Sequence, residues 1–271
     1  MESKKIRKTA FMMFKHCAKQ FEYFFFRDPD YDAYVEAEPD ELSPTGKGTI
    51  FHVGCDEFFG KLDLDEMKRL DSEADVVIYM KSKLPKTERL DDWFQYFAEL
   101  EAKRFMMCID AYPDNWKKVF MPVATELYVN LPGEYPRTGH VDRLDWLPAE
   151  KALCVVEYKT GRSYDLSKDR TLTGLRAECG WYALILQKLK TYDLPVIYWA
   201  CINPMKKQYH VERFHAMSLK SVEKQYQKLI TAIKNKGPFD RTLSPLCGWC
   251  KYSSDCLFNG YGEGEFGKDI L

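Results

Sequence analysis

An unbroken apolar run, Val196 to Ile202, restricts the possible folds of this chain more than any other feature. A strand that is apolar on both faces is typical of the centre of a sheet whose two sides are covered by helices. Helical patterns flank the run, because apolar residues recur every three or four positions over 172–189 and again over 219–233. The sequence therefore predicts an α/β fold with helices packed against a sheet.

Other elements follow from the same kind of pattern. Pro132, Gly133 and Pro136 interrupt a β-like region and separate two predicted strands. Gly237-Pro238 ends the last predicted helix. The predicted strands are 123–131, 137–146, 152–159, 196–202 and 209–214; the predicted helices are 4–26, one starting near Thr49, 87–103, 172–189 and one capped by Ser218. This order indicates a mixed sheet flanked by helices, with a helical N-terminal part and a cysteine-bearing C-terminal tail.

Composition excludes some classes of protein. The 271 residues carry a formal net charge of -1, so nucleic acid would have to bind in a local groove rather than through an overall positive field. No apolar run reaches eighteen residues, so no membrane association is expected. The apolar stretch after the basic start is broken by Lys15 and His16, which argues against a secretory signal. Nine cysteines that do not form a disulfide-like framework favour a reducing, cytoplasmic setting.

A carboxylate–lysine pattern carries the chemistry. Side chains alternate along a strand, so Glu157 and Lys159 are expected on one face while Tyr158 points away. Asp142, on the preceding strand, can reach the same face. Two converging carboxylates make a hard oxygen site for Mg²⁺ or Mn²⁺, and a nearby lysine suits phosphodiester hydrolysis. The alternative is a solvated strand face. However, Glu157 directly follows the apolar run Leu153 to Val156, where burying an unpaired carboxylate would be costly.

These residues belong to two longer motifs. G-x-x-D-R-x-D over 139–145, followed by V-x-E-Y-K-T-G over 155–161, resembles the RecB-like branch of the PD-(D/E)xK nuclease superfamily. The resemblance implies a restriction-endonuclease-like fold in which Asp142 and Glu157 bind the metal ion. It also implies that the carbonyl of Tyr158 is a further ligand and that Lys159 assists the attacking water.

Two more family elements have counterparts in the chain. A histidine ligand on an early helix would correspond to His52, which follows Gly48, although a lone histidine on an apolar helix is more often a core residue. A Gln-x-x-x-Tyr pair on the helix after the active-site strands would correspond to Glu178 and Tyr182, four residues apart on one helix face. Glu replaces Gln here, and an ionised Glu only accepts hydrogen bonds. Glu178 could therefore pair with an Arg or Lys instead of contacting DNA or metal.

The tail contains three closely spaced cysteines, Cys247, Cys250 and Cys256. Three thiolates at this spacing indicate a metal site that needs a fourth ligand, and Cys17 is the expected partner. The arrangement resembles nucleases of the same branch, the fourth CRISPR-associated (Cas) protein family and the AddB nuclease domain, in which such cysteines hold a [4Fe–4S] cluster. A zinc ion on the same four ligands and metal-free buried thiols remain alternatives.

The resemblance implies one nuclease domain over 1–271, with a helical subdomain over 60–120 and an iron–sulfur staple formed by 245–260 with Cys17. The expected activity is metal-dependent exonuclease action on single-stranded or frayed DNA ends, with Trp181 or Tyr158 stacking on bases. The alternatives are a non-cleaving module that binds DNA or a helicase, and a structural zinc protein. DNA, a helicase and CRISPR adaptation proteins are the expected partners.

Overall fold

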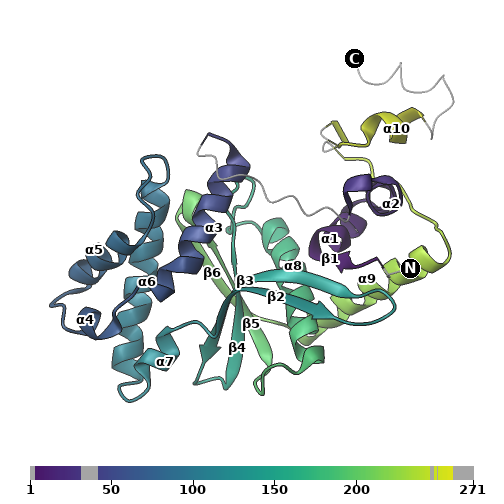
Figure 1. Cartoon of the computed structure of the whole chain (residues 1–271). Coiled ribbons are helices and arrows are strands. Elements are labelled where there is room, and N and C mark those ends of the chain that lie inside the picture. The colour runs from purple at the N-terminus through teal and green to yellow at the C-terminus, as the bar shows by residue number, and fades with distance from the viewer. Residues whose placement is uncertain (1–3, 32–41, 245–246, 249, 259–271) are drawn as a thin grey trace. The chain divides into compact units, whose positions relative to one another are not determined.

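The computed structural model, which describes residues 4–31, 42–244, 247–248 and 250–258, contains a mixed sheet (Figure 1). Within these residues the sheet has six strands in the order β1-β3-β4-β5-β6, and β2 also pairs with β3. The strands are β1 (Ile6–Arg7), β2 (Ala124–Leu131), β3 (Arg137–Leu147), β4 (Ala152–Tyr158), β5 (Val196–Asn203) and β6 (Gln208–Arg213). The predicted mixed sheet is confirmed, with strand bounds that differ from the predicted ones by a residue or so.

The register explains why the middle strands are apolar. β3 and β4 are antiparallel with Arg143 opposite Val156, whereas β4 and β5 are parallel with Val156 opposite Ala200. β5 and β6 are again antiparallel. All seven residues of β4 are buried. The β4–β5 pair is covered by helices, as parallel strands require.

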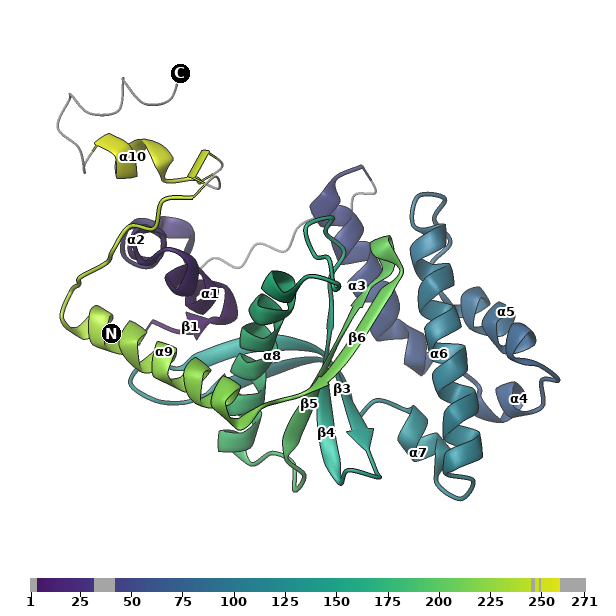
Figure 2. The same cartoon turned by 180° about the vertical axis from the view of Figure 1, so that it is seen from behind.

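Helices cover both faces of this sheet. The α-helices are α1 (Lys8–His16), α2 (Ala18–Glu22), α3 (Pro44–Gly60), α4 (Leu64–Lys68), α5 (Glu73–Lys83), α6 (Asp91–Ala111), α7 (Trp116–Phe120), α8 (Asp169–Leu189), α9 (Ala216–Lys234) and α10 (Ser253–Phe258). A π-helical turn (Tyr23–Arg27) and two 3₁₀ turns (Pro29–Tyr31 and Pro204–Lys206) complete the described elements. Seen from behind, α8 lies across β4 and β5 (Figure 2), while α3 and α6 lie on the other face.

The prediction of one helix over 4–26 is wrong. Cys17 has extended backbone angles, φ -156° and ψ 105°, and separates α1 from α2. Its own N–H still donates to the Met13 carbonyl at 2.8 Å, so the first helix closes before the break. Because no Gly or Pro marks this position, sequence pattern could not reveal it.

Two helix starts also differ from prediction. α3 begins at Pro44, five residues before Thr49, because the Ser43 hydroxyl accepts the Gly46 N–H at 2.9 Å and proline occupies the first helical position. α9 begins before Ser218, where His215 Nδ1 accepts the Met217 N–H at 3.3 Å. Capping interactions therefore extend both helices beyond the apolar pattern that predicted them.

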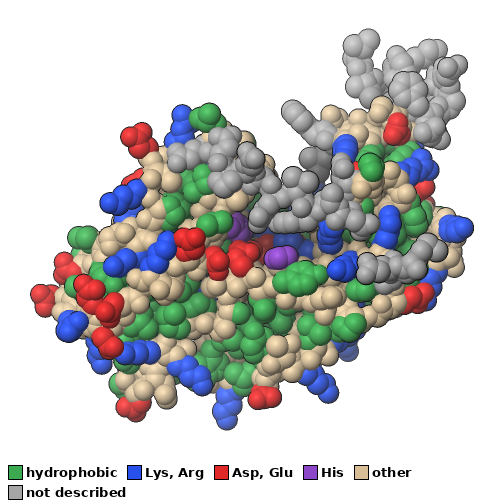
Figure 3. All heavy atoms as spheres, in the orientation of Figure 1, with side chains coloured by type: hydrophobic (Ala, Val, Ile, Leu, Met, Phe, Trp, Pro, Cys, Tyr) green, Lys and Arg blue, Asp and Glu red, His purple; other side chains and the backbone are tan. Residues whose placement is uncertain are grey.

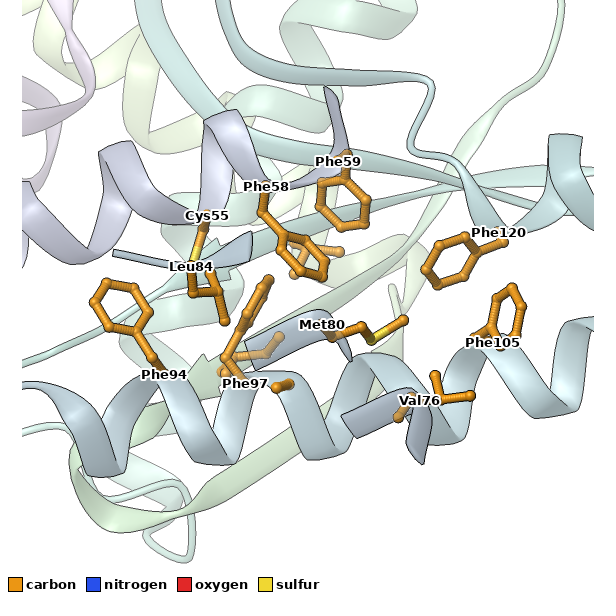
Figure 4. Packing of buried hydrophobic residues seen from close by; sticks show 14 of the residues in the cluster. Cys55, Phe58, Phe59, Val76, Met80, Leu84, Phe94, Phe97, Phe105 and Phe120 are labelled. Atoms are coloured by element: carbon orange, nitrogen blue, oxygen red, sulfur yellow. The ribbon is translucent and has the colours of Figure 1, made fainter. Parts of the chain in front are cut away.

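The chain divides into two compact units. The first consists of Met1–Val35, Pro132–Arg137 and Ser221–Leu271, and the second of Glu36–Leu131 and Thr138–Lys220. The second unit contains a large aromatic core (Figure 4). There Phe58 of α3 packs edge to face on Phe97 of α6 with centroids 5.3 Å apart, and Phe59 of α3 packs on Phe120 of α7. This packing fixes α3 against α6 and so fixes the helix that carries His52.

Candidate active site

Asp142 and Glu157 lie where β3 and β4 separate. The β3–β4 ladder ends at the pair formed by Arg143 and Val156, and Asp142 and Glu157 lie directly beyond it. Here the Asp142 side chain replaces a backbone carbonyl as hydrogen-bond acceptor, because its Oδ2 accepts the Tyr158 N–H at 2.6 Å. Both carboxylates are buried. The strand ends thus bring together two acidic groups in a setting that disfavours unpaired charge.

Asp142 also forms a group with His52 and Glu126. His52 Nδ1 of α3 is 3.5 Å from Asp142 Oδ1 and 3.7 Å from Glu126 Oε1 of β2. One ligand atom from each of the three residues lies within 4.8 Å of the others. Two carboxylates and an imidazole suit Mn²⁺ well, and also Mg²⁺ where oxygen ligands dominate. Figure 3 shows histidine and acidic side chains side by side near the middle of the face, where α3 meets β2 and β3.

Electrostatics within this group favour a positive charge. Burial lowers the pKa of His52, but the nearby carboxylates of Asp142 and Glu126 outweigh it and raise that pKa to about 10. In the metal-free protein, His52 is therefore protonated near neutral pH. The imidazolium occupies the place that a cation would otherwise take between the two carboxylates.

Lys159 lies between two carboxylates on the α8 side of the sheet. Its Nζ is 2.7 Å from Glu157 Oε1 and 2.7 Å from Glu178 Oε2. Glu178 pairs with a lysine here, which was one of the two outcomes expected for a Glu in place of Gln. These two ion pairs fix the position of the Lys159 ammonium. Glu157 is not one of the residues of the metal-binding group that His52, Glu126 and Asp142 form.

Tyr182 packs on the same side. A Cβ added at Gly139 of β3 would lie 2.5 Å from Tyr182 Cε1, so only glycine allows this ring to approach the strand. Burial, followed by the negative charge of Glu157, raises the pKa of the Tyr182 phenol well above its usual value. The side chain therefore remains a neutral phenol. The glycine of the 139–145 motif is explained by this contact.

Tyr158 and Trp181 do not have the role expected of base-stacking residues. The Tyr158 ring is buried against Phe51 and Phe97, and its hydroxyl accepts from Arg143 Nη1 at 3.3 Å. Trp181 is fully buried, and its Nε1 donates to the Thr138 carbonyl at 3.1 Å. The prediction that either ring stacks on a base is wrong, because both rings fill the core.

Arg143 connects the site to the helical segment. The guanidinium donates to Asp145 Oδ2 at 2.8 and 3.1 Å and to Glu101 Oε1 of α6 at 2.7 Å. Glu101 also contacts Arg104 at 2.7 Å. Burial raises the pKa of Glu101, but the charges of Arg104 and Arg143 outweigh it and hold that pKa below its usual range. Strand β3, which carries Asp142, is therefore tied to α6 through buried charges.

Two of these acidic residues were missed in the sequence. Glu126 lies inside the predicted strand 123–131, but its backbone has φ 41°, the left-handed region, so simple alternation does not predict where its carboxylate points. Glu101 lies inside the predicted helix 87–103 as one of several charged residues. A carboxylate in a strand otherwise made of apolar and neutral residues was the available signal for Glu126.

The four cysteines line one pocket in the first unit. Cys17, Cys247, Cys250 and Cys256 surround it together with Tyr23 and Arg241, among others. Cys247 Sγ accepts the Ser244 N–H at 3.4 Å. Tyr23 stacks on Tyr252 with centroids 5.6 Å apart and donates to the Asp255 carbonyl. The tail and the start of the chain therefore meet around these thiols.

Comparisons with known proteins identify the family. A model of the PD-(D/E)XK nuclease superfamily matches residues 9–257. A structure from Eubacterium rectale, described as a candidate exonuclease, is 12% identical over 96% of this chain and 94% of its own, with a TM-score of 0.44. A protein named SSO0001 is 14% identical over 74% of this chain and 95% of its own, with a TM-score of 0.33. No curated protein sequence matches the chain. Among the described residues, no helix is long and apolar enough to cross a membrane.

Proposed function

The chain belongs to the PD-(D/E)XK nuclease superfamily, and from this membership we propose a divalent-metal-dependent DNA exonuclease that acts on single-stranded or frayed ends. One observation carries the proposal: a His–Glu–Asp group capable of binding metal lies next to a lysine held between two carboxylates. We also propose that 1–271 is one nuclease domain of the RecB-like branch, with 60–120 as its helical subdomain. Its proposed setting is the cytoplasm, and its proposed partners are a helicase or CRISPR adaptation proteins.

The donor set fits a divalent cation. His52, Glu126 and Asp142 would hold the ion, with Glu157 and the Tyr158 carbonyl as further proposed ligands. A bound Mg²⁺ or Mn²⁺ would lower the pKa of water and offset the charge that develops on the phosphate. Asp142 has a second task in this chain, because it fixes the Tyr158 backbone through the 2.6 Å hydrogen bond.

Lys159 is the proposed partner of the attacking water. Its ammonium is bound by Glu157 and Glu178, so it is presented at the strand end in a fixed direction. A positioned donor stabilises a water nucleophile or the phosphate oxygens without reorganising during the reaction. Glu178 acts as a positioning residue through Lys159, and Tyr182, packed on Gly139, closes the side of the site next to β3.

The experiment that tests this proposal is cleavage of end-labelled single-stranded DNA with Mn²⁺, using anaerobically purified protein. We expect wild type to cleave, Lys159→Ala to lose cleavage, and Lys61→Ala, an exposed lysine paired with Glu57, to behave as wild type. Retained cleavage in Lys159→Ala would place the chemistry elsewhere. Binding of DNA without cleavage by wild type would instead identify a non-cleaving DNA-binding module.

For the four cysteines we propose a [4Fe–4S] cluster that joins 245–260 to Cys17. A tetrahedral zinc ion with bonds of ~2.3 Å would bring its sulfurs to about 3.8 Å from one another. In the described residues no three of these thiols lie within 4.8 Å of one another. All four thiols nevertheless line one pocket, where a single metal group could contact all of them. The Ser244 backbone N–H, which donates to Cys247 Sγ at 3.4 Å, suits a thiolate ligand.

Metal analysis tests the cluster directly. We expect purified wild type to contain iron and sulfide and to show visible absorption. Cys250→Ser should lose both, whereas Cys108→Ser, a thiol outside the pocket, should keep both. Stoichiometric zinc without iron in anaerobically prepared protein would identify a zinc site and refute the cluster.

A further inference from the structure

We propose that Tyr128 and His140 form a stacking site for one nucleobase of the DNA strand, next to the phosphate that is cleaved. The inference rests on the proposed nuclease function and adds a binding site to it. Tyr128 is on β2 and His140 on β3, and their ring centroids are 5.0 Å apart with an angle of 53° between the rings.

The position of the pair relates it to the metal-binding group. Tyr128 follows Glu126 by two residues and His140 precedes Asp142 by two. Two residues along a strand span about 7 Å. His140 thus lies one strand repeat from Asp142, and Tyr128 contacts the His140 ring from the neighbouring strand. A strand of DNA whose phosphate is at Asp142 would bring a neighbouring base within reach of these rings.

Exposure separates this pair from the buried aromatic residues near the site. The Tyr128 side chain is 48% exposed, and His140 is exposed as well. By contrast, Tyr158, Trp181 and Tyr182 are buried and unable to contact a base. Among these aromatic side chains, Tyr128 and His140 are the ones that a base could reach from solvent.

Stacking matches the expected substrate. Unpaired bases stack on aromatic rings regardless of sequence, because every base has a π-face, and a nuclease that degrades many sequences needs this tolerance. The phenol and imidazole also have polar edges that tolerate water when the site is empty. The occupant that we propose is therefore an unpaired base rather than an apolar protein segment.

The test combines a substitution in the protein with a deletion in the DNA. Binding of single-stranded oligonucleotides is measured in Ca²⁺, and kcat/KM is measured in Mn²⁺, for wild type, Tyr128→Ala, Tyr128→Phe and Tyr209→Ala. Each substrate carries one abasic nucleotide, and its position is moved stepwise from the end. Tyr209 is the matched control, because it is a strand tyrosine that is 51% exposed on β6.

The expected result is a position-dependent loss. Tyr128→Ala should weaken DNA binding on the order of 5- to 150-fold, the range that one base–aromatic stack provides. Tyr128→Phe and Tyr209→Ala should stay close to wild type. At one abasic position wild type should lose a similar factor and Tyr128→Ala should lose nothing further, because the two changes remove the same contact.

Other results would overturn the inference. Equal DNA binding by wild type and Tyr128→Ala would refute it while leaving the nuclease proposal intact. A loss in Tyr128→Ala that is equal at all abasic positions and accompanied by a lower Tm would show that the pair only stabilises the hairpin. If wild type neither bound nor cleaved any DNA, the proposed function would fail and this inference with it.

Discussion

Replacing Arg143 with glutamine should cost the protein a large part of its stability. The guanidinium is 3% exposed and makes the interactions that satisfy Asp145 Oδ2. Asp145 Oδ1 is buried without a hydrogen-bond partner in the described part of the chain, so removing Arg143 leaves this carboxylate unpaired. Breaking a buried pair by removing one partner costs about 3–5 kcal/mol. Glu101 keeps Arg104, so most of the cost should come from Asp145.

Circular dichroism measures this cost: urea titration gives the free energy of unfolding, and heating gives Tm. At about 2–4 °C per kcal/mol for a chain of this size, Arg143→Gln should lower Tm by roughly 6–20 °C. Adding Asp145→Asn removes the unpaired charge and should recover about 1–3 kcal/mol. Arg104→Gln, which leaves Glu101 bound to Arg143, is the control and should cost clearly less than Arg143→Gln.

Two results would refute the reasoning. One is a cost for Arg143→Gln below about 1 kcal/mol, which would mean that the charges are better hydrated than their burial suggests. The other is an Asp145→Asn substitution that adds to the damage instead of reducing it. In that case the asparagine amide, and not the unpaired Asp145 carboxylate, would cause the loss of stability.

Three further predictions concern single sites. His52 has a pKa of about 10 without metal and must be neutral to bind it, so metal affinity should rise with pH from 6 to 9 and binding should release a proton. Calorimetry in two buffers measures this proton release, and His52→Gln should release none. Gly139→Ala should cost about 1–3 kcal/mol in thermal unfolding, because its Cβ displaces Tyr182, whereas Gly133→Ala, with open space around it, should be nearly neutral. The lowered pKa of Glu101 contributes stability above its unfolded pKa of about 4.3, so acid should remove that contribution from wild type and not from Glu101→Gln, as urea midpoints at pH 3 to 6 would show.

The strands were predictable because their signals are local. The apolar run at Val196 and the turn residues between 132 and 136 fix β-structure within a few residues of sequence, and β5 and β3 begin within one residue of the predicted positions. The break at Cys17 was not predictable. No Gly or Pro marks it, and the cysteines that share its pocket, Cys247 to Cys256, follow more than two hundred residues later.

Tertiary contacts also explain the misses at the site. Glu126 itself has left-handed backbone angles, which break the alternation of side chains along the strand that sequence reasoning relies on. Its carboxylate therefore approaches His52 in a way that alternation does not predict. Aromatic content alone does not separate core from surface, so the sequence did not show that the Tyr158 and Trp181 rings are buried. The pairing of Glu101 with Arg143 depends on how α6 packs, and residue spacing carries no information about it.

The discontinuous first unit has a consequence for biosynthesis. Its cysteine pocket needs Cys17 from the start of the chain and Cys256 from its end. At about 5–20 residues per second, a ribosome needs roughly 10–50 s to add the residues between them. Meanwhile the second unit, which contains the candidate active site and draws on no residue after Lys220, is already complete in sequence. Insertion of the proposed cluster would therefore be a late step in maturation, and chains released early would carry the candidate active-site residues without the cysteine pocket.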